Sequence, residues 1–176
     1  MKYTSEENEK KALFEVARLM VTAARTAPKA KGVDNILTLV VYGGEKDAIV
    51  AEMNRIAEDM QNPVFTRDAK SVDASEYVIF LAVRDNHALL PFCGNCGFED
   101  CEKAKAAGSP CVFNISDLGT AACAASVVAA NHFVDNRMMY TVGSAAKSIG
   151  LFGTEIRLCY GIPISAGGKN IYFDRK

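Results

Sequence analysis

The sequence has little of several features that mark common classes of protein. Its 176 residues carry a formal net charge of −1 with no block of basic residues, so nucleic-acid binding has no electrostatic support. No apolar run approaches the ~20 residues that span a bilayer. The N-terminal stretch is polar and charged, unlike a signal peptide. We therefore expect a cytoplasmic protein that binds neither nucleic acid nor membrane.

Motifs of several enzyme classes are missing as well. The sequence contains no G-x-G-x-x-G nucleotide fingerprint. Neither Ser126 nor Ser144 lies in a G-x-S-x-G elbow, which argues against a hydrolase. No carboxylate is spaced around His87 or His132 in a way that predicts a catalytic pair, so both are expected to be ordinary core or surface histidines.

Cysteine, by contrast, is concentrated in one segment. Four of the six cysteines follow the spacing C-x2-C-x4-C-x9-C, at Cys93, Cys96, Cys101 and Cys111. In a reducing cytosol, clustered cysteines are metal ligands or redox groups more often than disulfides. The glycines after the first two cysteines let the backbone fold back toward the sulfurs. We predict that residues 91–111 form a metal-binding loop with these four thiolates as ligands.

The spacing constrains the ligands and leaves the metal open. Four thiolates at this density fit an iron–sulfur cluster or an all-cysteine zinc site that only staples the loop. A loop without metal is the third alternative. Of the other two cysteines, Cys123 lies among alanines and is expected to behave as a small buried apolar residue. Cys159 falls on the polar face of a predicted strand.

Apolar periodicity predicts an alternation of helices and strands in one domain over residues 1–176. The segment after Asn62 and Pro63 is predicted to be a polar loop. The predicted helix that begins near residue 116 is rich in small residues, which indicates that this helix is buried. Helices are expected at 5–27, 45–60, 116–134 and 140–149, strands at 36–42, 77–83, 154–164 and 170–173, and an extended segment at 111–115.

The cysteine segment also carries a resemblance. Residues Cys93 to Cys101 read C-G-N-C-G-F-E-D-C, which resembles the C-G-x-C-G-x-x-x-C opening of small four-iron domains in anaerobic corrinoid and electron-transfer proteins. Those domains usually place their fourth cysteine further downstream than Cys111. The whole chain is similar to a prokaryotic family known for a ferredoxin-like domain. This resemblance implies a 4Fe-4S cluster that exchanges single electrons, with a redox partner protein as one expected interaction.

A second resemblance is to the flavin-dependent nitroreductases. Residues Thr22 to Ala30 read T-A-A-R-T-A-P-K-A, similar to the A-A-x-x-A-P-S-A helix end of that family. The segment from Asp117 resembles its central helix, the segment from Lys147 its L-G-L element, and the segment from Tyr160 its late G-x-P strand. The resemblance implies an α+β fold: a three-layer α/β/α sandwich with a mixed sheet, an inserted four-cysteine loop and a homodimer packed at the central helix.

The same resemblance implies a flavin site. FMN is then a candidate cofactor, with Arg25, Lys29, Lys31 and Asn35 as its candidate contacts. The family's R-x-S-x-R phosphate motif is absent, and Lys29 stands where the family has serine. The alternative is a basic loop that complements a helix C-terminus. The expected function is an iron–sulfur redox protein, acting as a flavin-dependent reductase or an electron carrier. The alternative is a non-enzymatic zinc-binding or metal-sensing protein.

Overall fold

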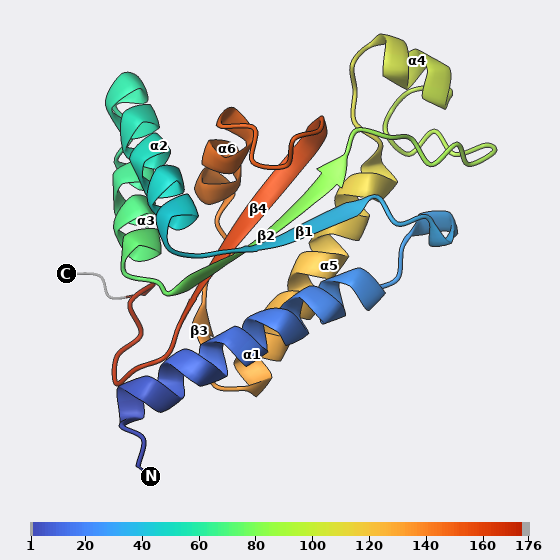
Figure 1. Cartoon of the computed structure of the whole chain (residues 1–176). Helices are drawn as coiled ribbons and strands as arrows, with labels where there is room; N and C mark the ends of the chain where they lie inside the picture. The colour runs from blue at the N-terminus through green and yellow to red at the C-terminus, as the bar shows by residue number, and fades with distance from the viewer. Residues whose placement is uncertain (1, 174–176) are drawn as a thin grey trace.

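A four-stranded sheet lies between two layers of helices (Figure 1) in a computed structural model that describes residues 2–173. The strand order is β1-β2-β4-β3, so the two longest strands, β2 and β4, lie side by side in the middle. The strands are β1 (Ile36–Val41), β2 (Tyr77–Arg84), β3 (Asp135–Asn136) and β4 (Ile156–Ser165).

Strand β2 is buried on both faces because helices cover both sides of the sheet. Its residues alternate between the two cores, with Ile79 and Leu81 facing one and Val78 and Phe80 facing the other. This alternation follows from the two-residue period of a strand. The apolar run that predicted a doubly buried strand at 77–83 is therefore confirmed.

Two long helices form one outer layer, α1 (Ser5–Thr26) and α5 (Val112–Asn131). Helix α1 begins at a capping box, in which the Thr4 hydroxyl accepts from the Glu7 N–H and the Glu7 carboxylate accepts from the Thr4 N–H. The buried stripe of α1, which includes Leu13 and Met20, packs against alanines of α5 and one face of the sheet. The small residues of α5 allow this close packing.

By length and composition, α5 is also the one helix in the described part of the chain that could cross a membrane. Its buried residues, among them Leu118, Ala122 and Ala125, face α1 and the sheet. The apolar character of α5 is therefore accounted for by its place in the core.

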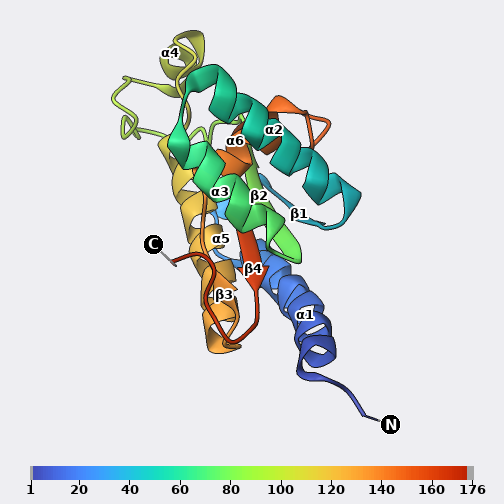
Figure 2. The same cartoon turned by 90° about the vertical axis from the view of Figure 1, so that its left-hand side faces the viewer.

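Three helices form the opposite layer (Figure 2): α2 (Gly44–Met60), α3 (Pro63–Asp73) and α6 (Tyr140–Ser148). Helix α6 lies unusually close to β4. A Cβ atom added at Gly143 would lie 1.8 Å from the Cys159 carbonyl oxygen, and one at Gly161 would lie 2.2 Å from Val142 Cγ1. Glycine at both positions lets the helix and strand backbones approach.

The sheet is antiparallel at each of its described pairings, which corrects the mixed sheet that the resemblance implied. The connections explain the difference. Helices α2 and α3 cross the sheet in opposite directions, so the chain returns to the end at which β1 stopped (Figure 1). Strand β2 must then run back beside β1. The three-layer sandwich itself is confirmed.

Three local predictions were wrong. The segment after Asn62 is helix α3, because the Asn62 side chain caps it, Pro63 suits its first turn, and Phe65, Ala69 and Val72 form a buried stripe. The segment at 111–115 is the start of α5, since Asn114 and Leu118 share its buried face. Residues 170–173 form bends without a strand partner.

Replacing Gly143 with alanine should strongly destabilise the fold, because the added methyl group overlaps a backbone oxygen that cannot move without distorting β4. We expect a loss of about 3 kcal/mol in unfolding free energy, or about 6–12 °C in melting temperature. Thermal unfolding followed by circular dichroism measures it. Gly44→Ala is the matched control, since an added Cβ there has no neighbour within 4 Å. Equal melting temperatures for the two variants would contradict the close approach of α6 and β4.

Candidate metal centre

The cysteine-rich segment forms an excursion between the end of β2 and the start of α5. Residues 85–100 contain no helix or strand, the short helix α4 (Cys101–Ala106) follows, and the chain re-enters the core at Cys111. Figure 1 shows α4 and the segment before it projecting beyond the end of the sheet. The predicted cysteine loop therefore lies outside the sandwich and is attached to it at two points.

Three of the four cysteines line one pocket of about 340 Å³: Cys93, Cys96 and Cys101. Tight turns bring them together, with Gly94 at φ 58° and Gly97 at φ 86°, and the Gly97 N–H donates to the Gly94 carbonyl at 3.0 Å. Both glycines occupy the left-handed region that other residues adopt with strain. The remaining walls combine apolar residues with three carboxylates. The apolar residues are Leu89, Leu90, Pro91, Phe92 and Phe98, and the carboxylates are Glu99, Asp100 and Glu102.

The fourth cysteine lies at the point where the loop rejoins the core. Cys111 is 6% exposed and is the N-cap residue of α5, and its side chain makes no capping hydrogen bond. The first N–H groups of a helix favour negative charge at this position. Across residues 2–173, no three metal-binding side chains are already drawn together closely enough to hold an ion. The structure thus gathers three predicted ligands and leaves Cys111 outside their pocket.

Three asparagines close the base of the loop, and we call Asn35, Asn86 and Asn114 the neck. The Asn35 amide donates to Asn114 Oδ1 at 3.3 Å, and the Asn86 amide donates to Asn35 Oδ1 at 3.3 Å. The Asn114 amide donates to the Asn86 carbonyl, which joins the two ends of the cysteine loop. The neck therefore connects the start of β1, the residues after β2 and the first turn of α5.

The predicted flavin contacts lie on the segment that leads into the neck, around the short helix η1 (Ala30–Gly32). The Arg25 guanidinium pairs with Asp34 at 2.8 Å. The Lys29 ammonium donates to the Ala24 carbonyl at 3.1 Å and to the Arg25 carbonyl. These two cations therefore complement the C-terminus of α1, as in the alternative interpretation.

The other two predicted flavin contacts differ in their surroundings. Lys31 is exposed at φ 57°, whereas Asn35 belongs to the neck. The Ala30 N–H donates to both Asp117 carboxylate oxygens at 3.1 and 3.2 Å, which fixes η1 against α5. Lys31 is thus the predicted flavin contact whose charge faces solvent, and the flavin assignment stays a prediction.

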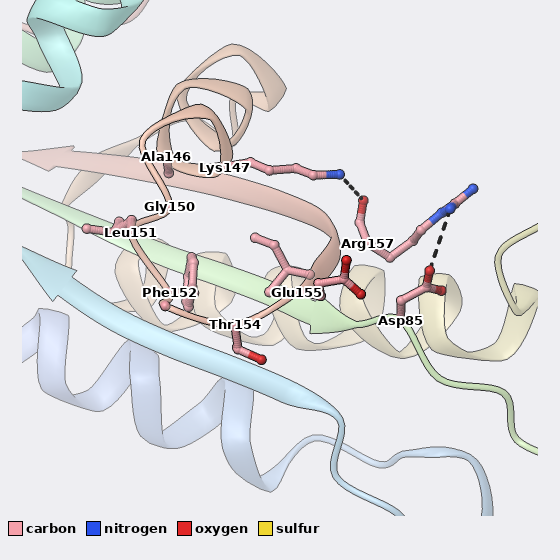
Figure 3. Close-up of a pocket in the computed structure, with 11 residues that line it drawn as sticks. Asp85, Ala146, Lys147, Gly150, Leu151, Phe152, Thr154, Glu155 and Arg157 are labelled. Carbon is pink, nitrogen blue, oxygen red and sulfur yellow. Dashed lines mark hydrogen bonds and ion pairs between the residues drawn. The ribbon is translucent and has the colours of Figure 1, made fainter. Parts of the chain in front are cut away.

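A second pocket, of about 580 Å³, lies beside the base of the loop (Figure 3). The Arg157 guanidinium of β4 pairs with Asp85 at 3.6 Å and donates to the Gly108 carbonyl at 2.9 Å. The Lys147 ammonium of α6 donates to the Arg157 carbonyl at 3.3 Å. Arg157 is thus a third tie between the sandwich and the cysteine loop, after the neck and the backbone at Cys111.

The two cysteines outside the loop differ in burial from what the sequence predicted. Cys123 is exposed on α5, whereas its alanine-rich surroundings predicted burial. Cys159 is 3% exposed because α6 covers its side of β4, and burial raises the pKa of its thiol to about 12. A thiol that stays protonated is a poor metal ligand, so Cys159 is not a candidate for the metal centre.

Sequence patterns missed the polar residues that support the loop, namely Asn86, Asn114, Asp117 and Arg157. Asp117 lies next to the predicted start of a helix near residue 116, but α5 begins at Val112 with Cys111 as its cap. The partners of these residues are distant in sequence, 79 residues for Asn35 and Asn114. No local spacing could have revealed such pairs.

Comparison with known proteins gives relatives for most of the chain. Residues 107–175 match a family described as uncharacterized proteins containing a ferredoxin domain. A protein from Archaeoglobus fulgidus, described as uncharacterized, is 38% identical over 167 residues. That alignment covers 90% of this chain and 89% of the archaeal protein.

Solved structures of similar fold are nitroreductases. The FMN-dependent nitroreductase NfnB from Mycobacterium smegmatis, in complex with NADPH, matches with a TM-score of 0.61 and 13% identity, covering 88% of this chain and 78% of that one. A nitroreductase with bound FMN from Desulfitobacterium hafniense matches with a TM-score of 0.61, 14% identity and the same coverage of 88% and 78%.

NfrA2 from B. megaterium has a TM-score of 0.56 and 12% identity, covering 89% of this chain. The chain spans 58% of NfrA2, less than two thirds of its length. At these identities the likeness shows the nitroreductase fold and nothing beyond it.

Replacing Asn114 with alanine should loosen the cysteine loop, because it leaves the Asn86 carbonyl and the Asn35 amide without their buried partner. We expect a loss of about 1–3 kcal/mol in unfolding free energy. We also expect faster cleavage by chymotrypsin after Leu89 or Phe92, which are 59% and 106% exposed. Asn95→Ala, an exposed position in the same loop, is the control. Equal cleavage rates for both variants would contradict a role of the neck.

Proposed function

We propose that this chain, which belongs to the family of uncharacterized proteins containing a ferredoxin domain, is a redox protein whose cysteine loop binds an iron–sulfur cluster. The observation that carries the proposal is the shared pocket of Cys93, Cys96 and Cys101, with Cys111 at the base of the same loop. When bound, a 4Fe-4S cluster supplies one-electron transfer.

The chemistry of the loop suits a thiolate-bound centre. All six cysteines are free, which leaves the four loop thiols available in the reducing cytoplasm that we propose for this protein. Apolar side chains line part of the pocket, and the three cysteines that line it are partly exposed, so a metal source can reach their sulfurs. At Cys111, the unpaired N–H groups at the start of α5 favour the negative charge of a thiolate ligand.

The sandwich would position the loop and limit its movement. The neck holds the Asn86 end against the first turn of α5, and Arg157 holds the Gly108 carbonyl near the other end. Because both ends are tied, the movement that brings Cys111 together with the other three cysteines would take place within the loop. Positioning of the ligands by a rigid scaffold is the contribution of the protein to such a site.

We further propose a homodimer with an FMN site, since the nitroreductases of similar fold include structures with FMN. The α1 and α5 layer carries exposed apolar side chains that a partner would cover: Leu19 and Val127 are 47% and 55% exposed. Lys31 is the side chain on η1 that would meet the flavin phosphate. A flavin there would make the protein a reductase, whereas its absence would leave an electron carrier.

Protein purified without oxygen should be brown and contain iron and acid-labile sulfide, because four clustered thiolates bind an iron–sulfur cluster. Cys93→Ala and Cys101→Ala should each lose most of the iron. Cys123→Ala, which removes an exposed thiol outside the loop, should keep the iron of the unmodified chain. Elemental analysis with absorbance and electron paramagnetic resonance (EPR) spectra measures the result.

Zinc in place of iron in this experiment would sink the redox proposal and favour the structural or metal-sensing alternative. Iron that is retained in both Cys93→Ala and Cys101→Ala would show that the centre lies elsewhere. Metal removal by chelator should loosen the loop more than the sandwich, because the loop lies outside both cores.

FMN titrated into the dimer should bind saturably, with a change in flavin fluorescence. Lys31→Ala should weaken binding about tenfold, which corresponds to about 1.4 kcal/mol, because it removes a charge that pairs with the phosphate. Lys105→Ala, an exposed cation on α4, is the control. A monomer by light scattering, or fluorescence that never saturates, would leave the electron carrier as the proposed function.

A further inference from the structure

His87 is a buried side chain without partners. It lies in the connector between β2 and the cysteine loop and is 7% exposed. Neither of its ring nitrogens has a hydrogen-bond partner among residues 2–173. Among the described residues, the Ser165 hydroxyl is the other buried side-chain polar atom without a partner. Native proteins rarely leave such groups unpaired. The imidazole is therefore a buried group that still needs a hydrogen-bond partner.

The neck connects the backbone at His87 to the first turn of α5, which begins at the fourth cysteine. The His87 N–H donates to Asn86 Oδ1 at 2.9 Å, and the Asn86 carbonyl accepts from the Asn114 amide. Asn114 and Cys111 are three residues apart at the start of α5, so they lie on neighbouring positions of one helix face. Cys111 is buried like His87. Two buried residues thus flank the neck, His87 next to Asn86 and Cys111 at the start of the helix that carries Asn114.

We propose that His87 donates a ring N–H to the sulfur of Cys111 when the loop holds its cluster. This inference rests on the proposed function. A donated hydrogen bond stabilises negative charge on the sulfur, and the reduced cluster carries one more electron than the oxidised one. His87 is then a positioning residue that raises the reduction potential of the centre and orients its Cys111 corner.

Direct ligation of the metal by His87 is the less favoured arrangement. A ligating histidine almost always donates its other ring N–H to a carboxylate, a carbonyl or water. The described residues give His87 no such acceptor. Donation to sulfur uses the ring N–H and leaves only an acceptor nitrogen unpaired, and unpaired buried acceptors are more common than unpaired buried donors.

The test measures the midpoint potential of the anaerobically loaded protein by a redox titration followed by EPR. His87→Phe keeps a planar ring of similar size and removes the donor, so its potential should shift to more negative values at unchanged iron content. His87→Gln retains an amide N–H and should recover part of the shift. His132→Gln, which changes the exposed second histidine at the end of α5, should leave the potential unmoved.

A spectroscopic readout on the native His87 covers the case in which His87→Phe fails to fold. The His132→Gln background leaves one histidine, so 15N-histidine labelling reports on His87 alone. Pulsed EPR should then show a weak 15N coupling, as for a nitrogen that is hydrogen-bonded to a cluster sulfur. A strong coupling would mean direct ligation, and no coupling would mean that His87 lies away from the centre; either result overturns the inference.

Different results would overturn the iron–sulfur function and the role of His87. Protein without iron overturns the iron–sulfur function, and the inference about His87 falls with it. Normal iron content together with unchanged potentials in both His87→Phe and His87→Gln overturns only the role of His87 and leaves the iron–sulfur function standing.

Discussion

The hydrogen bond from the Asn114 amide to the Asn86 carbonyl holds the two ends of the cysteine loop together. Asn35 completes the neck and joins it to the start of β1, so three elements of the sandwich converge on the base of the loop. Asn114 is buried, whereas Asn35 is half-buried and Asn86 is exposed. A buried amide is costly unless it is paired, so the hydrogen bonds of Asn114 favour this arrangement of the neck. The position of the four cysteines relative to the rest of the fold depends on it.

Strong local signals in the sequence identified most of the fold. The apolar runs that became β1 and β2 and the periodic stripe of α1 were confirmed because burial in the core repeats at every second residue of a strand and every third or fourth of a helix. Helix α3 was missed because charged residues separate the few apolar residues of its buried face, Phe65, Ala69 and Val72. The first turn of α5 was missed because its β-branched and aromatic residues favour a strand. In the structure, burial of one helix face, which includes Asn114 and Leu118, outweighs that preference.

Sequence patterns likewise identified one part of the candidate site and missed the other. Spacing alone pointed to the four cysteines, because ligands of one centre must be close in space and a short loop brings them close. The polar residues that support the loop had no such signal. Asn35 and Asn114 are 79 residues apart, and Ala30 and Asp117 are 87 residues apart. His87 was predicted to be an ordinary histidine, because the sequence does not show that its ring is buried or that its nitrogens lack partners.

The attachment of the cysteine loop at its ends, by the neck and by Arg157, bears on how the length of the loop can change. Because these ties lie near the ends, extra residues between them add mainly to the entropic cost of closing the loop. That entropy grows only with the logarithm of loop length, about 0.6 kcal/mol for each doubling. Insertions or deletions between Asn86 and Gly108 can therefore change the number and spacing of the cysteines while the sandwich keeps its fold.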